Sequence, residues 1–295
     1  MKILLVGSSG QLGKSIFQKS PNNIDLLMPN KMEFNLINGI KCYEYIIRNK
    51  PDWVINSGAY TNVDKAEKEK DLAYQINTIG PQFIANALKK IGGKLLQIST
   101  DYVFSGQQKQ PYLPDQSLSP INKYGETKAK AENILSDILI ENNQLIILRT
   151  SWLISNQGNN FATKIIQLNN EKDKIDVVCD QIGSPTCSKS LSGAIWKLIE
   201  VNEKYSLEGN VFPKITQFTD NGIASWYDVA VAVSDLAFKK GIINKLATIK
   251  PIFSSQYPTA ALRPSYSVLD SNATRKILNL KKFNWRDSLI EEFCS

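Results

Sequence analysis

Short apolar runs alternate with amphipathic stretches along the first half of the chain. The runs lie at residues 2–6, 24–28, 53–57, 94–99 and 145–149. Unbroken apolar runs of this length are typical of strands that are buried on both faces of a sheet. Between them, helical spacing occurs at 12–19, 39–49, 72–91 and 124–141. This alternation predicts an α/β fold, a Rossmann-type doubly wound parallel sheet with right-handed crossovers.

After residue 151 the alternation weakens. Further strands are predicted at 177–178 and 211–218, and helices at 188–202 and 226–240. The tail contains Pro251, Pro258 and Pro264, which predict that it is broken into loops. We therefore expect an NAD(P)-binding Rossmann domain over 1–150 plus roughly 187–218. A smaller C-terminal substrate-binding domain would take roughly 151–186 and 219–295, with the ligand between the two.

The composition excludes several classes of site. The chain has 295 residues, 42% hydrophobic and 21% charged, as expected for a globular protein with a sizeable core. Its net charge is +7, but the basic residues are spread along the chain, which favours a compositional bias over nucleic-acid binding. It has no histidine, so any proton donor must be Tyr, Lys, Cys or a carboxylate.

The cysteines and the first residues indicate the compartment. Cys42, Cys179, Cys187 and Cys294 show no CxxC spacing and are expected to be free thiols in a reducing environment. The N-terminal run has the features of a strand and lacks those of a signal peptide, and no run approaches the length of a membrane-spanning helix. We expect a cytoplasmic protein with no membrane association.

A glycine-rich turn follows the first predicted strand and opens a helix. Gly7 allows a tight turn, Gly10 lets the backbone approach a pyrophosphate, and Gly13 lets the helix pack on the strand. The helix N-terminus then offers free N–H groups to the phosphates. Incidental glycines in a plain turn are the alternative, but the position after the first strand of a βαβ pattern favours a dinucleotide.

The end of the second predicted strand bears on which dinucleotide is bound. An acidic residue there would bind the ribose 2′-hydroxyl of NAD, but the sequence is Met-Pro-Asn-Lys at 28–31. Lys31 would suit a 2′-phosphate, which favours NADPH and leaves NADH possible. The alternative is that Lys31 is a solvated loop charge.

Tyr124 and Lys128 stand four residues apart at the start of a predicted helix, so they share one face. A nearby cation favours the phenolate and is expected to lower the tyrosine pKa toward a useful range. Two solvated helix residues are the alternative. Thr100 favours the catalytic interpretation, because it ends the fourth predicted strand, and ligands of such sheets bind at the carboxyl ends of the strands. Its hydroxyl would bind a substrate carbonyl or cap a local loop.

Together these motifs resemble the extended short-chain dehydrogenase/reductases, and most closely the dTDP-4-dehydrorhamnose reductases. The resemblance runs from residue 1 to about 265. Besides the glycine-rich turn, it rests on NSGAYTNVD at 56–64, STDYVF at 99–104, YGETK at 124–128, RTSW at 149–152, GNNF at 158–161, DQIGSPT at 180–186, SWYD at 225–228 and Arg-Pro at 263–264.

The resemblance implies an activity and residue roles. Hydride would pass from NADPH to C4 of a dTDP-linked 4-keto-6-deoxy sugar, dTDP-4-dehydro-L-rhamnose, giving dTDP-L-rhamnose. Tyr124 would protonate the oxygen, Lys128 would hold the nicotinamide ribose, and Thr100 would orient the carbonyl. Cofactor-binding residues would be Gly7, Gly10, Gln11, Leu12, Gly13, Lys31, Asn35, Leu36, Gly58, Ala59, Tyr60, Thr61, Tyr124 and Lys128. Substrate-binding residues would be Thr100, Asp101, Trp152, Asn160, Gln181 and Arg263.

Arg263 is the implied partner of the substrate diphosphate, which a guanidinium binds in a bidentate manner. A surface arginine before a proline is the alternative for that residue.

The chain also departs from some relatives, which carry acidic residues that bind a divalent ion between two subunits. Here Lys14-Ser15 and Lys189-Ser190 occupy the corresponding neighbourhoods. We therefore expect no metal, and a monomer or weak homodimer. Two other functions stay open: a non-catalytic regulatory subunit like that of methionine adenosyltransferase, and a 4-ketoreductase acting on another nucleotide deoxysugar.

Overall fold

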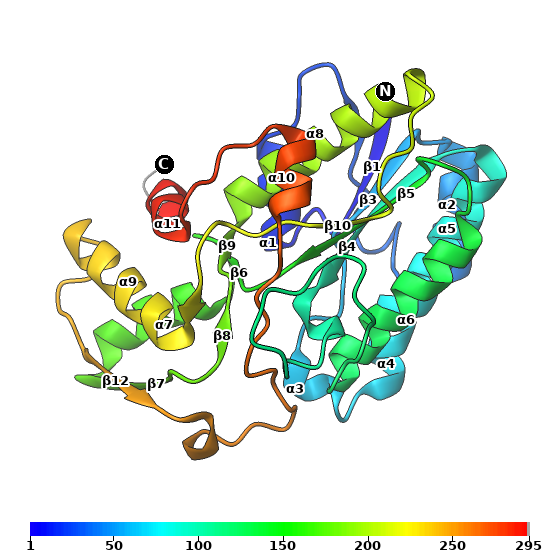
Figure 1. The fold of residues 1–295 in the computed structure, drawn as a ribbon. Coiled ribbons are helices and arrows are strands. Elements are labelled where there is room, and N and C mark those ends of the chain that lie inside the picture. Colours follow the sequence, from blue (N-terminus) through cyan, green and yellow to red (C-terminus); the bar gives the residue numbers. More distant parts are fainter. Residues whose placement is uncertain (294–295) are drawn as a thin grey trace.

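A parallel sheet of six strands forms the centre of the computed structural model, which describes residues 1–293 (Figure 1). The strand order is β10-β5-β4-β3-β1-β2, and every neighbouring pair is parallel. The predicted fold class is confirmed. The strands are β1 (Lys2–Val6), β2 (Asp25–Leu27), β3 (Trp53–Asn56), β4 (Lys94–Thr100), β5 (Leu145–Thr150) and β10 (Ile215–Gln217).

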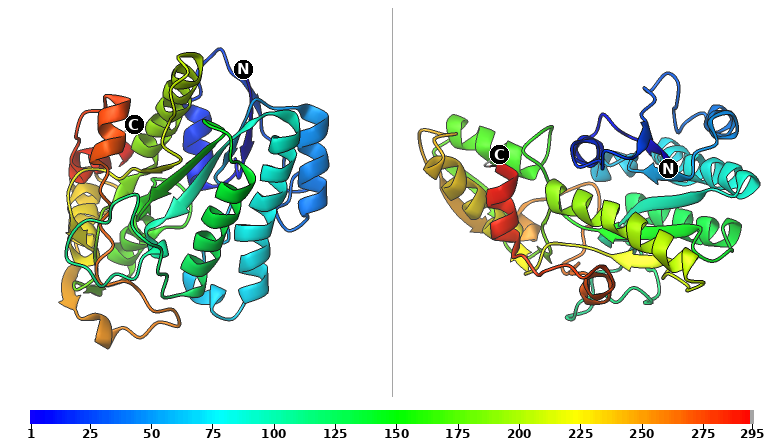
Figure 2. Two further views of the ribbon diagram at one scale, coloured as in Figure 1. Left: turned by 45° about the vertical axis from the view of Figure 1, so that its right-hand side comes forward. Right: turned by 90° about the horizontal axis from the view of Figure 1, so that it is seen from above.

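Helices cover both faces of this sheet. One face carries α2 (Gly39–Asn49), α5 (Gly80–Ile91) and α6 (Lys123–Ile138), which Figure 2 shows side by side. The other carries α1 (Gln11–Gln18), α8 (Ser188–Leu207) and α10 (Asn272–Leu278). Each face buries its own apolar cluster, as a doubly wound sheet requires. Leu278 of α10 belongs to the apolar cluster that α1 and α8 form on this face of the sheet, so part of the tail packs with the sheet.

The region 63–91 differs from the single helix predicted over 72–91. It contains α3 (Val63–Ala66), α4 (Lys70–Tyr74), a π-helical turn η1 (Gln75–Ile79) and α5. Pro81 lies in the first turn of α5 and has no N–H to donate to the Asn77 carbonyl four residues earlier. The wider π turn forms where this hydrogen bond is missing.

A second apolar core lies beside the sheet, on the left in Figure 1. Its helices are α7 (Phe161–Glu171), α9 (Trp226–Lys239) and α11 (Trp285–Phe293), and its main strands are the parallel pair β7 (Lys174–Val178) and β12 (Thr248–Ile252). Two short pairs connect to it: β6 (Leu153–Ile154) with β9 (Thr186–Cys187), and β8 (Ile182–Gly183) with β11 (Ala224–Ser225). The exact division of the chain into two domains stays a prediction.

The tail is more regular than its prolines predicted. Pro251 lies inside β12, which among the described residues pairs with β7 alone, and an edge strand tolerates a residue without an N–H. The expectation of a loop is therefore wrong for Pro251, whereas Pro258 and Pro264 do lie in the irregular segment between β12 and α10. The strand predicted at 211–218 is shorter, at Ile215–Gln217, and the helix predicted at 188–202 continues to Leu207.

Two further features of the fold concern the state of the cysteines and the character of the helices. Cys42, Cys179 and Cys187 are free thiols, as predicted, and Cys294 lies outside the described residues. Within residues 1–293, no helix combines the length and the apolar character that crossing a membrane requires.

Candidate active site

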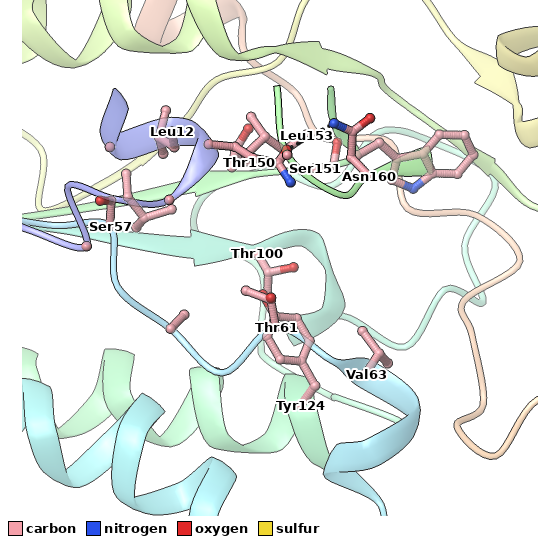
Figure 3. A pocket seen from close by; sticks show the side chains of 18 of the residues that line it. Leu12, Ser57, Thr61, Val63, Thr100, Tyr124, Thr150, Ser151, Leu153 and Asn160 are labelled. Carbon is pink, nitrogen blue, oxygen red and sulfur yellow. Dashed lines mark hydrogen bonds between the residues drawn. The ribbon is translucent and has the colours of Figure 1, made fainter. Parts of the chain in front are cut away.

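A pocket of about 810 Å³ opens at the carboxyl ends of β1, β3, β4 and β5 (Figure 3). The sheet side contributes the glycine-rich turn, the loop after β3 and the start of α6, and the opposite side contributes residues 150–161, Trp226 and Arg263. Fifteen of the predicted site residues line this pocket: Gly7, Gly10, Gln11, Leu12, Gly13, Gly58, Ala59, Thr61, Thr100, Asp101, Tyr124, Lys128, Trp152, Asn160 and Arg263.

Five predicted site residues do not line it: Lys31, Asn35, Leu36, Tyr60 and Gln181. Lys31 is exposed in the turn after β2. Leu36 is buried and packs close to Gly58, which does line the pocket. The Tyr60 hydroxyl points elsewhere and donates to a Glu69 carboxylate oxygen at 2.7 Å. The roles assigned to these five residues stay predictions.

The glycine-rich turn has no room for side chains at two of its three glycines. Gly7 has a φ of +80°, and a Cβ added there would lie 2.6 Å from the Gly58 amide nitrogen. A Cβ at Gly13 would lie 2.1 Å from the Gly7 carbonyl oxygen. The backbone of β1, the β3 loop and α1 is thus packed closely. The first turn of α1 carries no acidic side chain, so its free N–H groups suit the diphosphate of a dinucleotide.

Thr100 lies between two ionisable side chains. Its hydroxyl donates to Asp101 Oδ1 at 2.9 Å and accepts from the Tyr102 amide at 3.2 Å, so it also caps the short 3-10 turn η2 (Asp101–Val103). A side-chain hydrogen bond also links it to Tyr124. Figure 3 shows Thr100 and Tyr124 together in the pocket. Thr100 therefore lines the pocket and is also a local cap, and its role toward a substrate carbonyl stays a prediction.

Burial controls the protonation of these groups. Burial raises the pKa of Tyr124 well above its ordinary value, and the negative charge of Asp101 raises it further, whereas the bond to Thr100 opposes the shift. The expected lowering of the Tyr124 pKa by a nearby cation is therefore wrong, because loss of hydration determines the direction of the shift. Burial also raises the pKa of Asp101 to about 6, against hydrogen bonds that lower it. Tyr124 is fully protonated at neutral pH.

Lys128 lines the pocket and is buried, so it is not the solvated helix residue of the alternative interpretation. Its ammonium is buried and donates to the Ile98 carbonyl at 2.6 Å. Burial lowers its pKa to about 8, and the negative charge of Glu132, one turn further along α6, opposes this shift. Lys128 is thus mostly charged at neutral pH and titrates just above it.

A buried ion pair beside Lys128 was not predicted from the sequence. Glu132 accepts from Arg149 Nε at 3.0 and 3.1 Å and from Nη2 at 2.6 Å, and from the Ser99 hydroxyl. Arg149 also donates to the Pro114 carbonyl, and its guanidinium lies 5.0 Å from the Phe104 ring centroid. The pair ties α6 to the ends of β4 and β5. The motif at 149–152 drew attention to Arg149, but nothing in the sequence identified Glu132 as its partner.

Aromatic side chains form the far side of the pocket. The Trp152 and Trp226 rings stack at 3.7 Å with an interplanar angle of 6°, and Phe161 packs against Trp226 at 4.6 Å. Trp152 has a φ of +46°, which is unusual for a bulky residue. A Cβ added to Gly183 would lie 2.5 Å from the Trp152 indole, so the glycine of the DQIGSPT motif leaves room for this ring.

Arg263 spans the two sides of the pocket. Its Nη2 donates to Asp64 Oδ2 at 2.7 Å, and its guanidinium also hydrogen-bonds the Tyr102 side chain. Its Nε is buried without a partner. The Arg263 side chain is about one-quarter exposed and lines the pocket, and its Asp64 carboxylate partner holds it in place.

Asn160 joins the opposite end of the pocket to the glycine-rich turn. It caps α7 through the Ala162 and Thr163 amides, and its Nδ2 donates to Gln11 Oε1 at 3.2 Å. Gln11 in turn donates to the Asn159 carbonyl at 2.9 Å. These bonds connect residues almost 150 positions apart in the sequence.

Several lining residues were not among the predicted site residues. Most belong to motifs from which another member was predicted to bind: Ser9, Ser57, Val63, Ser99, Tyr102, Thr150, Ser151, Gly158, Asn159 and Phe161. The sequence alone did not show which member of each motif faces the pocket. Trp226 belongs to the motif at 225–228, from which no residue was predicted, and the others are Lys14, Ile98, Leu153 and Gln157.

Comparison with known proteins gives one consistent result. Residues 1–294 match the family model described as RmlD substrate binding domain. The chain is 34% identical to the dTDP-4-dehydrorhamnose reductase of Aggregatibacter actinomycetemcomitans, with 98% of this chain and 97% of the relative covered. It is 33% identical to the spore coat polysaccharide biosynthesis protein SpsK of Bacillus subtilis, with 98% and 96% covered.

Among solved structures, the chain is similar to the dTDP-4-dehydrorhamnose reductase of Bacillus anthracis in complex with NADP. The TM-score is 0.88 at 32% identity, covering 99% of this chain and 98% of that one. A dTDP-4-dehydrorhamnose reductase of Clostridium acetobutylicum gives a TM-score of 0.89 at 34% identity, covering 100% and 99%.

Proposed function

The chain belongs to the family defined by the RmlD substrate binding domain, and on that premise we propose that it reduces dTDP-4-dehydro-L-rhamnose to dTDP-L-rhamnose with NADPH. The observation that carries the proposal is the meeting of Tyr124, Thr100 and Lys128 with the glycine-rich turn in one pocket. Relatives named dTDP-4-dehydrorhamnose reductase, and one such structure that contains NADP, support the substrate and the cofactor.

The pocket residues fit the cofactor. The close packing at Gly7 and Gly13 and the acid-free first turn of α1 suit the diphosphate, and residues 58–61 would lie beside the nicotinamide half. NADPH bound along this path supplies the hydride for the ketone carbon. The Lys128 ammonium would hold the nicotinamide ribose, since it is buried, mostly charged and lines the same pocket as Tyr124.

The proton comes from Tyr124. Its raised pKa keeps the phenol protonated at neutral pH, which is the form that a ketone reduction requires. As the C4 oxygen gains negative charge, the Tyr124 O–H gives it the proton, and the Thr100 hydroxyl, already bonded to the same tyrosine, orients the carbonyl. Proton and hydride thus reach the same carbonyl group from the chain and the cofactor.

The rest of the substrate would lie toward the aromatic side of the pocket. Asp101, which is hydrogen-bonded to Thr100, lines the pocket, as do Trp152, Asn160 and Arg263. Arg263 would bind the diphosphate with the pocket-facing side of its guanidinium while Asp64 holds the other side. Gln181 is proposed for the same region from the resemblance alone.

A turnover assay tests the proposed function. Purified protein should oxidise NADPH when dTDP-4-dehydro-L-rhamnose is added, and the product should co-migrate with dTDP-L-rhamnose. The matched control is a 4-keto-6-deoxy sugar linked to GDP, which should be turned over much more slowly. Folded protein that binds NADPH but reduces only another deoxysugar would reject the substrate, and protein that reduces none would reject the reductase itself.

The cofactor preference gives a separate prediction about Lys31. A Lys31→Glu substitution should lower kcat/KM for NADPH relative to NADH by about tenfold, because an acidic side chain repels a 2′-phosphate and accepts a 2′-hydroxyl bond. The comparison is the ratio of the two kcat/KM values in the parent and the variant. Lys50→Glu, at the end of α2 and just before β3, is the control for a charge reversal away from the carboxyl ends of the strands. An unchanged ratio would leave Lys31 as a solvated loop charge.

Three further expectations stay predictions: the cytoplasmic location, the monomer or weak homodimer, and the absence of a bridging metal. The identity of the nucleotide sugar rests on the family, because no lining residue described above distinguishes thymine from other bases by itself.

A further inference from the structure

The pocket contains a buried carboxyl that has no ion-pair partner within residues 1–293. Asp101 is 2% exposed, lines the pocket and takes part in none of the ion pairs of that range. The donors that favour its charged form are neutral: the Thr100 and Ser267 hydroxyls and the backbone amides of Asp101 and Tyr102. A buried carboxylate without a counter-charge is costly, so a proton on Asp101 is readily accommodated.

The nearest titratable groups around this carboxyl are phenols. The negative charge of Asp101 raises the pKa of Tyr124, on α6, and of Tyr102, the next residue, so both phenols lie close to it. Arg263 and Asp64, which pair with each other, act on Tyr102. Both phenols stay protonated at neutral pH, whereas the pKa of Asp101 is about 6.

Thr100 has a single hydroxyl hydrogen, and Asp101 accepts it. The Thr100 hydroxyl donates to Asp101 Oδ1 at 2.9 Å and accepts from the Tyr102 amide at 3.2 Å. A further side-chain bond joins Thr100 to Tyr124. Because one hydroxyl donates only once, the Tyr124 phenol is the donor in that bond. The donors therefore run from Tyr124 through Thr100 to an ionised Asp101.

A bound ketone changes this count of donors. A ketone oxygen only accepts hydrogen bonds, so Tyr124 and Thr100 can both bind it only if both donate. Tyr124 can turn its O–H from Thr100 to the ketone, but the Thr100 hydrogen would have to leave the Asp101 carboxylate. A buried charge would then lose its donor, which is unfavourable. A proton on Asp101 removes the conflict, since the carboxylic O–H then donates to Thr100.

We propose that Asp101 is a positioning residue that carries a proton in the ketone complex and donates a hydrogen bond to Thr100, which directs the Thr100 hydroxyl hydrogen at the ketone oxygen. This inference rests on the proposed function, because it assumes that a ketone oxygen binds between Thr100 and Tyr124. Asp101 thus acts on the reaction through Thr100. Its pKa of about 6 supports the proposal, because uptake of a proton near neutral pH is inexpensive.

The pH profile of turnover gives the first test. The kcat/KM value reports groups of the free enzyme, and above the Asp101 pKa of about 6 the protonated fraction falls about tenfold per pH unit. The parent should therefore lose at least about tenfold in kcat/KM between pH 7 and 8. Asp101→Asn keeps a neutral donor toward Thr100, so it should lose only about twofold, from Lys128 of α6, whose pKa is about 8. At pH 6 it should stay within about tenfold of the parent.

Asp220 offers a matched control. It is also 2% exposed, and burial raises its pKa to about 6 as well. It accepts from the Cys187 amide and the Ser190 hydroxyl and lies outside the pocket lining. Asp220→Asn removes the same charge from a second buried carboxyl, so it should keep the pH profile of the parent. A profile that changes equally in both variants would overturn the inference.

A double variant shows whether Asp101 acts through Thr100. Thr100→Val should lower kcat about 100-fold, as loss of one donor to a developing oxyanion does, and should leave only the twofold fall between pH 7 and 8. Asp101→Asn added to Thr100→Val should cause no further loss, because the group that it positions is gone. A further loss would show that Asp101 acts directly on the sugar and would overturn the positioning role.

Proton uptake measures the same event without turnover. Calorimetry follows the binding of dTDP-4-dehydro-L-rhamnose to the full chain with NADP⁺, which has no hydride to give, at pH 7 in buffers of different ionisation enthalpy. The parent and Asp220→Asn should take up about 0.9 proton per site, the fraction that a carboxyl with a pKa of about 6 lacks at pH 7. Asp101→Asn should take up less than about 0.2. Absence of uptake in the parent would overturn the inference, and the parent value decides if Asp101→Asn does not fold.

Failure of the proposed function is distinguishable from failure of this inference. A parent protein that binds the ketone but reduces no 4-keto sugar rejects the proposed reaction, and proton uptake on binding still decides the role of Asp101. A parent that turns over with a kcat/KM that is constant or rises between pH 7 and 8 rejects the positioning role alone.

Discussion

Tyr124→Phe should lower kcat about 10²- to 10⁴-fold, the usual contribution of a positioned proton donor, while NADPH binding stays nearly unchanged. The substitution removes one hydroxyl from a half-buried ring that already packs edge-on against Tyr102 at 5.9 Å, so the fold has little reason to change. The chain has no histidine to replace the lost acid. Steady-state turnover and NADPH titration of the same preparation measure both effects.

Tyr102 supplies the control for this prediction. It also lines the pocket, and burial raises the pKa of its phenol to about 12, so it is another protonated tyrosine within reach of the site. Its hydroxyl is engaged with Arg263, however, whereas that of Tyr124 is bonded to Thr100. Tyr102→Phe should therefore affect the KM for the nucleotide sugar more than kcat. If Tyr102→Phe abolished turnover and Tyr124→Phe did not, the assignment of the acid would be reversed.

The layered fold could be predicted because its signals are local. The strands near 2–6, 53–57, 94–99 and 145–149 are buried on both faces and are therefore apolar without interruption. Helix α2 is capped by Asn38 and ends where Lys50 adopts a left-handed conformation, and its predicted bounds match. The surroundings of Pro251 were mispredicted, since tolerance of this proline depends on β12 lying at an edge, which the tertiary pairing determines.

The part of the site that lies at the carboxyl ends of the strands could be predicted from the sequence. Thr100 and the glycine-rich turn lie at the carboxyl edge of one parallel sheet, so their convergence follows from topology. The protonation state of Tyr124 could not be predicted from the sequence. Spacing places Lys128 near Tyr124, but the shift in the tyrosine pKa depends on burial, a property of the whole pocket. The Glu132 pairing with Arg149 likewise depends on how α6 lies over β4 and β5.

The Glu132–Arg149 pair gives the largest expected effect on stability. The two side chains are 2% and 1% exposed, and three nitrogen–oxygen contacts of 3.1 Å or less join them. Arg149→Met would leave the carboxylate buried without its counter-charge, and removing one partner of such a pair costs about 3–5 kcal/mol. Chemical denaturation of parent and variant measures this change. Lys94→Met, which breaks the more exposed pair with Glu203, should cost less than about 1 kcal/mol.

A double variant separates the value of the pair from the cost of an isolated charge. In Arg149→Met/Glu132→Leu no charge remains buried at this place, so the loss of stability should be clearly smaller than the sum of the two single losses. The Lys128 ammonium would then lose the negative charge that keeps its pKa from falling further. Stability recovered without activity would mean that the fold tolerates an apolar pair here while the reaction needs the carboxylate. Additive losses would instead show that the two side chains stabilise the protein through separate contacts.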